Sequence, residues 1–208
     1  MNAIITNTIT AILLTISVFC YFIYALIAWL KEDPRFNGLF VIFFLSIFLF
    51  ILVSVWAHYS CWNIHYRCFM RVWLCIALGV VFINYCAVYL VEMPNFFRHG
   101  IVTISLMLVW FQFMFNLYEF TALSLLLTTL IAGIYSRGLT RVGFFGLVFT
   151  NILWILIQVS VPLFLGHRLV PQNDYANDVY HILELVFIFI LFWSVVKGQW
   201  SYPKIHNT

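Results

Sequence analysis

Long hydrophobic runs separated by short polar segments occupy the chain almost from end to end. Each run has about the 20 residues that a helix needs to cross a hydrocarbon core of ~30 Å. The runs predict an all-α polytopic membrane bundle of seven transmembrane helices, with no stretch left for an extramembrane domain. We expect a single bundle over residues 1–208, with helices at 3–30, 38–58, 70–91, 100–116, 119–136, 143–165 and 178–196.

The division between the fourth and fifth helices depends on one polar segment. Residues 101–135 contain no proline, and the run is interrupted at Asn116, Glu119 and Gly133. A single helix of this length would extend roughly 20 Å beyond the bilayer at about 1.5 Å per residue. We therefore expect a tight turn at residues 116–119. A bundle of six helices, without this turn, is the alternative.

Composition excludes a water-soluble domain, because 65% of the residues are hydrophobic, 8% are charged and the mean hydropathy is +1.05. The net charge of +3 comes from single basic residues scattered over the loops. They form no basic stripe of the kind that nucleic-acid binding requires. We expect membrane lipids, and no nucleic acid, as partners.

The basic residues also predict the orientation of the bundle. In the seven-helix arrangement, three of the ten Lys and Arg residues lie on one side of the membrane, namely Arg67, Arg71 and Arg168, and the other seven on the opposite side. Because cytoplasmic loops carry an excess of Lys and Arg, the side with seven is predicted to be cytoplasmic. The N-terminus is then outside and the C-terminus inside the cell.

Most of the unusual polar residues fall in the outer half of this predicted bundle. They are Ser54, His58, Arg71, Glu119, Gln158, Asn177, Asp178, His181 and Glu184. Ser54 and His58 share one face of the second helix, and Asp178 and His181 share one face of the last, with Glu184 one turn deeper. Ionisable groups at membrane depth are costly unless they face a cavity, a partner or a metal ion. The pattern therefore predicts a polar site in the outer leaflet.

Structural interpretations of the same residues stay open. His58 is also explained by a hydrogen bond to a loop carbonyl, and Ser54 by a hydrogen bond to the carbonyl one turn back in its helix. Asp178 fits a first-turn acid or a helix cap, and Asn177 fits the N-cap position. Glu184 is also explained as a protonated carboxyl group that is hydrogen-bonded inside the bundle, or as a carboxylate paired with Arg71.

A seven-helix bundle with Ser54-x-x-x-His58 late in its second helix and Asp178 and His181 at the start of its last helix resembles the CREST superfamily. That superfamily contains the alkaline ceramidases and the progestin and adipoQ receptors. The chain departs from the family pattern at Asn177, where the family has a histidine four residues before its last one. The family aspartate early in the third helix is also missing, since residues 69–71 are Phe, Met and Arg.

The resemblance implies a zinc ion held by His58, Asp178 and His181, with Asp178 in place of the missing histidine and a fourth position left for water. Zinc lowers the pKa of such a water and makes it a nucleophile. Glu184 or Glu119 would accept its proton, and Ser54 would hydrogen-bond the developing oxyanion. The implied activity is hydrolysis of a lipid amide or ester bond near the headgroup level.

Two non-catalytic classes of function stay open beside this enzyme. The first is a receptor or transporter-like protein that binds a small ligand in the same polar pocket. The sequence lacks the matched pair of Gly/Pro-broken helices that is typical of transporters. The second is a membrane scaffold of the same fold, which the departure at Asn177 favours.

Overall fold

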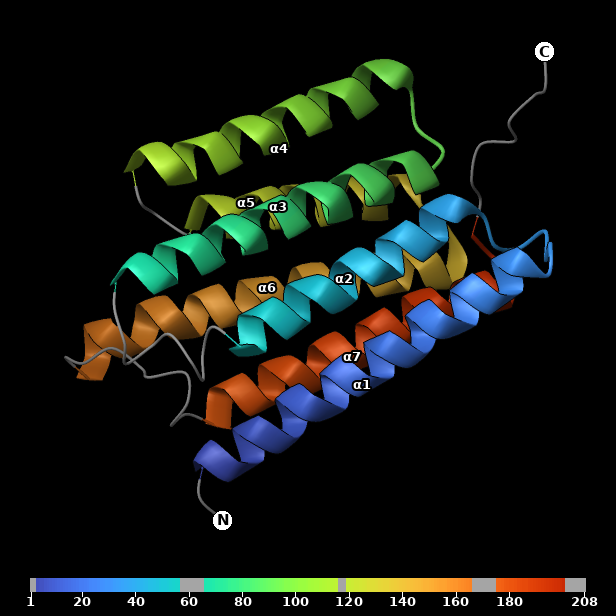
Figure 1. Ribbon diagram of the computed structural model, residues 1–208. Coiled ribbons are helices and arrows are strands. Elements are labelled where there is room, and N and C mark those ends of the chain that lie inside the picture. Colours follow the sequence, from blue (N-terminus) through green and yellow to red (C-terminus); the bar gives the residue numbers. More distant parts are fainter. Residues whose placement is uncertain (1–2, 57–65, 116–118, 166–174, 201–208) are drawn as a thin grey trace.

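The computed structural model of the protein describes residues 3–56, 66–115, 119–165 and 175–200, except for the side chains of residues 3–5, 7, 66–74, 119, 158–165 and 175–177. These residues form seven α-helices and no strand (Figure 1). The helices are α1 (Ala3–Leu30), α2 (Gly38–Trp56), α3 (Tyr66–Leu90), α4 (Asn95–Phe115), α5 (Glu119–Tyr135), α6 (Gly138–Leu165) and α7 (Tyr175–Val196). The predicted all-α class is confirmed.

Five stretches within the described residues are long and apolar enough to cross a membrane. They are Thr8–Leu30, Gly38–Trp56, Asn95–Phe115, Gly138–Ile157 and Asp178–Val196. Two shorter apolar stretches, Cys75–Leu90 in α3 and Phe120–Tyr135 in α5, accompany them. The protein is therefore an integral membrane protein that crosses the bilayer several times. The structure has seven helices among the described residues, and it stays a prediction that all seven cross the bilayer.

The predicted break between the fourth and fifth helices is present, because α4 ends at Phe115 and α5 begins at Glu119. The turn itself lies outside the described residues. Four helices begin three to five residues before the position predicted from hydrophobicity; their first residues are Tyr66, Asn95, Gly138 and Tyr175. A hydrophobic run marks the hydrocarbon core, whereas a helix continues into the polar interface with its first turn.

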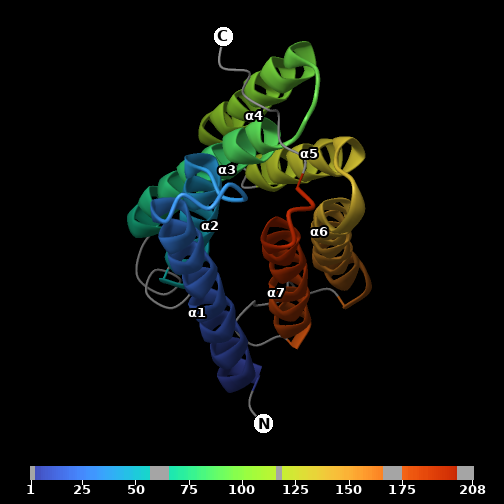
Figure 2. The same ribbon diagram turned by 90° about the vertical axis from the view of Figure 1, so that its right-hand side faces the viewer.

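Six helices form a closed ring, and α4 packs outside it. Around the ring, α1 contacts α2, α2 contacts α3, α3 contacts α5, α5 contacts α6, α6 contacts α7, and α7 returns to α1. Helix α4 packs against α3 and α5 on the outer side of the ring (Figure 2). The interior of the bundle is therefore lined by residues from helices far apart in the sequence.

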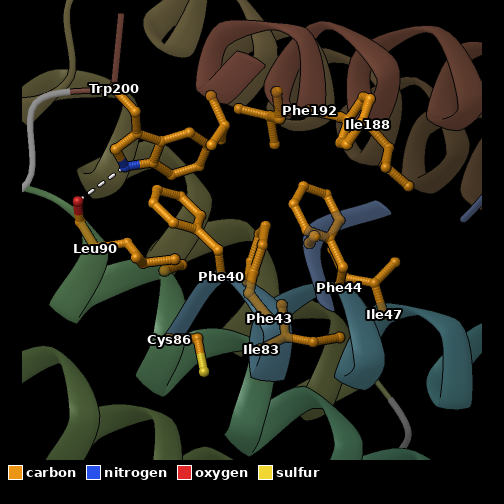
Figure 3. Packing of buried hydrophobic residues seen from close by; sticks show 14 of the residues in the cluster. Phe40, Phe43, Phe44, Ile47, Ile83, Cys86, Leu90, Ile188, Phe192 and Trp200 are labelled. Carbon is orange, nitrogen blue, oxygen red and sulfur yellow. Dashed lines mark hydrogen bonds between the residues drawn. The ribbon is translucent and has the colours of Figure 1, made fainter. Parts of the chain in front are cut away.

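An aromatic core fills the end of the ring where α2 begins and α7 ends. Its members are Phe40, Phe43, Phe44, Phe144, Phe192 and Trp200, all of which except Phe144 are labelled in Figure 3. The Trp200 indole contacts three of these rings and donates a hydrogen bond of 2.8 Å from Nε1 to the carbonyl of Leu90 at the end of α3. The ring of Tyr21 from α1 stacks on that of Phe192, with centroids 4.6 Å apart. These contacts join α1, α2, α3, α6 and α7 at one end of the bundle.

Helices α6 and α7 approach each other closely at two glycines of α6. A Cβ atom at Gly146 would lie 1.9 Å from Cδ1 of Phe187, and one at Gly143 would lie 2.5 Å from Cδ2 of Leu191. A side chain at either position would therefore push the helices apart. Small residues at such contacts are typical of membrane helix pairs, because they allow extensive van der Waals packing.

The loop between α1 and α2 is fixed by one ion pair at the same end as the aromatic core. Nη2 of Arg35 lies 2.7 Å from Oδ2 of Asp33, and Nη1 of Arg35 donates a 2.7 Å bond to the carbonyl of Val196 at the end of α7. Hydrogen bonds from the Arg35 side chain and backbone lower the pKa of Asp33 to about 2. The carboxylate therefore stays ionised throughout the neutral and mildly acidic range, so the charge that the pair requires is present.

Candidate functional site

The antiparallel course of the helices brings several predicted site segments to one end of the bundle. At this end α1, α3, α5 and α7 begin and α2, α4 and α6 end (Figure 1). We call it the α1/α7 start. It lies opposite the aromatic core. The prediction that the start of the last helix and the end of the second lie at the same end is confirmed.

Asp178 and His181 are brought together at the α1/α7 start by a residue of another helix. The hydroxyl of Thr10 in α1 lies 3.0 Å from Oδ1 of Asp178, to which it donates, and 3.2 Å from Nδ1 of His181. Asp178 is buried, with 7% of its surface exposed. One hydroxyl thus joins a buried carboxylate and an imidazole that lie one turn apart on α7.

The hydrogens available limit the tautomers of His181 that fit these contacts. A threonine hydroxyl has one hydrogen, and an ionised carboxylate only accepts hydrogen bonds. If Asp178 is ionised, Thr10 donates its one hydrogen to the carboxylate, and its contact with His181 is then made by a hydrogen on Nδ1. A neutral imidazole in this tautomer carries its lone pair on Nε2. In that tautomer, Nε2 is the nitrogen of His181 with the character of a ligand.

The capping interpretation of Asn177 is wrong. Helix α7 begins at Tyr175, so Asn177 and Asp178 both lie inside its first turn. The hydrogen bond to Asp178 in this structure comes from Thr10, 168 residues earlier in the chain. Asp178 is thus a first-turn acid, which the helix dipole favours, and also a contact between two helices.

The other predicted site residues are placed less completely. His58 and the side chains of Glu119, Arg71 and Gln158 lie outside the part of the chain that the structure describes. Ser54 is half-buried near the end of α2. Among the described residues no group of three or more His, Cys, Asp and Glu side chains lies close enough to hold a metal ion. Asp178 and His181 are the predicted zinc ligands whose side chains are described.

Glu184 has a different set of contacts from Asp178 and His181. Its Oε1 accepts a hydrogen bond of 2.6 Å from the hydroxyl of Tyr180, and 8% of its surface is exposed. It lines a cavity of about 40 Å³ inside the ring, together with Asn84 of α3, Thr129 of α5 and Asn151 of α6. Glu184 therefore faces the middle of the bundle.

A network of small polar side chains beside this cavity was not predicted from the sequence. Nδ2 of Asn84 donates to Ser105 of α4 at 3.2 Å and to Ser124 of α5 at 2.7 Å, and the hydroxyls of Ser105 and Thr128 lie 3.2 Å apart. We call these four residues the polar network. The signal for it in the sequence is an asparagine, Asn84, in the middle of an apolar run, and it is weaker than the signal of an ionisable residue.

Comparison with known proteins gives no further identification, because no family model, no curated protein and no solved structure matches the chain.

Proposed function

We propose that the protein is a metal-dependent hydrolase of amide or ester bonds in membrane lipids, with its site at the α1/α7 start. The observation that carries the proposal is the double hydrogen bond of Thr10 to Asp178 and His181. It holds a carboxylate and an imidazole of one helix side by side. In the proposal, Nδ1 of the imidazole bonds to Thr10 and Nε2 binds the metal.

The donor set fits a zinc ion. A carboxylate and a histidine three residues apart on one helix are a spacing that metal sites in helical bundles use. A histidine ligand commonly donates its second ring N–H to an oxygen, which fixes the ring and its tautomer. Thr10 supplies that oxygen to His181 and also orients Asp178. In the proposal, Asp178 and Nε2 of His181 bind the metal, His58 is the third ligand, and Thr10 is a positioning residue.

The proposal gives the remaining residues the roles that the resemblance implies. A bound zinc ion would supply a Lewis acid and an activated water. Ser54, in the last turn of α2, donates a hydrogen bond to the oxyanion, and Glu119, at the start of α5, accepts a proton. Lipid substrates reach this end of the bundle from the bilayer, with their headgroups at the interface. The proposed orientation places the site in the outer leaflet, and a reporter fused to the C-terminus would then report a cytoplasmic location.

The proposal is tested by hydrolysis of fluorogenic lipid amides and esters by the purified protein, stripped with a chelator and titrated with zinc. We expect activity that depends on zinc, and none above background in Asp178→Asn and His181→Ala. Thr10→Val should require roughly 10–100-fold more zinc for half-maximal activity and recover at high zinc, because it removes a group that orients the ligands.

Thr15→Val is the matched control on the same helix, since the Thr15 hydroxyl donates to the carbonyl of Ala11, one turn back on α1. It should leave the zinc requirement unchanged. Equal effects of the two threonine variants, or turnover that persists after chelation, would contradict the proposal.

The alternative is a non-catalytic receptor, transporter-like protein or scaffold. The observation that favours it is the same hydrogen bond of Thr10, because a buried polar contact between α1 and α7 also stabilises the bundle. On this alternative, Thr10→Val lowers stability, no variant changes a zinc requirement, and the wild-type protein hydrolyses no lipid.

A further inference from the structure

Glu184 places a carboxyl group at an internal cavity whose lining is mainly apolar. Ten of the fourteen described residues that line this cavity are hydrophobic, and the polar ones besides Glu184 are Asn84, Thr129 and Asn151, which carry no charge. Glu184 is the tenth of the 22 residues of α7, so it lies near mid-bundle. An ionised carboxylate in such surroundings is costly unless a counter-charge lies beside it.

Three helices near Glu184 offer no counter-charge at its depth. Neither α1 nor α2 contains an Asp, Glu, His, Lys or Arg residue. In α6 the one such residue is Arg141, in the first turn at the opposite end of the bundle, where its guanidinium group donates to the carbonyls of Ile134 and Ser136. Within the described part of the chain, the one salt bridge joins Asp33 and Arg35 and lies at that opposite end as well.

The other three helices of the ring carry their acidic and basic residues toward the α1/α7 start. On α7, Asp178 and His181 precede Glu184, and both contact α1. The remaining titratable side chains of the ring helices are tyrosines and cysteines, which are uncharged at neutral pH. A carboxylate paired with Arg71 is the alternative that an experiment has to exclude. The acidic and basic residues of α3 and α5, whose side chains lie outside the described part of the chain, are Arg67, Arg71 and Glu119.

The hydrogen bond that Tyr180 donates to Glu184 supplies no charge. The Tyr180 hydroxyl lies 2.6 Å from Oε1 of Glu184, and the Tyr180 ring packs against Trp154 of α6 with centroids 5.9 Å apart. A phenol is a neutral donor, and it occupies one of the two carboxyl oxygens. The second oxygen is the position that a hydrogen can take.

A proton removes the charge of Glu184 without any of the polar ligands that a metal cation requires. It forms a covalent O–H bond with the carboxyl group and leaves a neutral acid, which apolar surroundings tolerate far better than a carboxylate. We propose that Glu184 is a proton-binding site: the folded bundle holds this carboxyl group as the neutral acid at neutral pH. Loss of the proton at alkaline pH loosens α7 from the ring, because it places a carboxylate against the apolar lining of the cavity.

A proton bound at Glu184 makes the stability of the bundle fall as the pH rises. In the unfolded chain the carboxyl group is exposed and loses its proton near pH ~4. Above that pH the folded protein binds one proton more than the unfolded chain, until the folded protein also releases it. In this interval the equilibrium constant for unfolding increases by up to about tenfold per pH unit. Below the interval both states are protonated, and the full contribution to stability is present.

Infrared spectroscopy of the purified protein at neutral pH tests the proton directly, because a protonated carboxylic acid has a carbonyl band that a carboxylate lacks. The band should be present in the wild type and absent in Glu184→Gln, which keeps the size of the side chain and an oxygen to accept from Tyr180. Asp178→Asn, which changes the other buried carboxyl group of α7, should retain the band. A folded wild type without the band would overturn the proposal and assign a counter-charge to Glu184. A band that Asp178→Asn removes and Glu184→Gln retains would also overturn it.

Unfolding in mixed micelles from mildly acidic to alkaline pH tests the effect on the bundle. The wild type and Asp178→Asn should lose stability as the pH rises, and Glu184→Gln should lack this component. The same pH dependence in Glu184→Gln as in the wild type would contradict the switch. The hydrolase proposal is unaffected by either outcome, since it assigns no role to Glu184.

Tyr180→Phe provides a test if Glu184→Gln does not fold. It keeps the ring against Trp154 and removes the hydrogen bond to Glu184. The carbonyl band of the neutral acid should persist in this variant and move to higher frequency, because the carbonyl oxygen loses a donor. A band at the same frequency as in the wild type would show that it does not come from Glu184, and would overturn the proposal.

Discussion

Two regions of the bundle are held together mainly by different interactions. Helices α3, α4 and α5 are joined by the polar network of Asn84, Ser105, Ser124 and Thr128, whereas α1, α2 and α7 pack through the aromatic core and α6 meets α7 at Gly143 and Gly146. In a bilayer, lipid tails are as apolar as the side chains, so helices associate through packing and hydrogen bonds. Packing dominates in one region and side-chain hydrogen bonds in the other, although Thr10 also bonds to Asp178 between α1 and α7, and Thr140 to Ser194 between α6 and α7.

The contact between α6 and α7 should be more sensitive to a change of side-chain volume than the region of the polar network. Gly146→Val places a branched side chain where a Cβ atom alone would lie 1.9 Å from the ring of Phe187. Because α6 and α7 would have to separate, we expect a loss of more than about 3 kcal/mol and little folded protein. Yield of monodisperse protein and unfolding in mixed micelles measure this effect.

Gly100→Ala in α4 is the matched control, since no heavy atom lies within 4 Å of a Cβ atom at that position. It should leave the stability unchanged or raise it slightly, because alanine favours a helix over glycine. A similar loss of stability in both glycine variants would show that the close contact between α6 and α7 is not the cause of the loss.

The protein should lose stability when Asn84, the central residue of the polar network, is replaced. Asn84→Ala eliminates two hydrogen bonds, to Ser105 and Ser124, and we expect a loss of about 1–3 kcal/mol in mixed-micelle unfolding. Thr129→Val is the control on α5, because the Thr129 hydroxyl donates to the carbonyls of Leu125 and Leu126 in its own helix. If the control costs as much as Asn84→Ala, hydrogen bonds between helices do not stabilise this region.

The smallest effect should come from the single hydrogen bond of the aromatic core. Trp200→Phe keeps an aromatic ring against Phe40 and Phe144 but removes the bond from Nε1 to the carbonyl of Leu90. We expect a loss of about 1 kcal/mol, measured in the same unfolding experiment. A loss as large as that of Gly146→Val would show that this end depends on the hydrogen bond rather than on the packing of rings.

The sequence predicted the architecture well because the membrane imposes a strong pattern. Hydrophobic runs located all seven helices, and the polar residues at Asn116 and Glu119 located the break between α4 and α5. The starts of α3, α4, α6 and α7 were predicted too late, since their first turns lie in the polar interface, where hydrophobicity gives no signal.

The functional role of the candidate site stays a prediction, and the sequence singled out only some of its residues. Asp178 and His181 were selected because ionisable residues at the start of a membrane helix are unusual. Thr10 was missed, because a threonine in an apolar helix is common and nothing in the sequence pairs α1 with α7. The cavity was missed for the same reason: Asn84, Asn151 and Glu184 come from three helices, and only the closed ring shows that they share one space.

The central claim is that the α1/α7 start holds a metal ion, and elemental analysis of the purified protein tests it most directly. After reconstitution with zinc, the account predicts stoichiometric zinc in the wild-type protein and none in a folded His58→Ala/His181→Ala double variant. A folded wild-type protein without zinc, or a double variant that retains the metal, would contradict the claim.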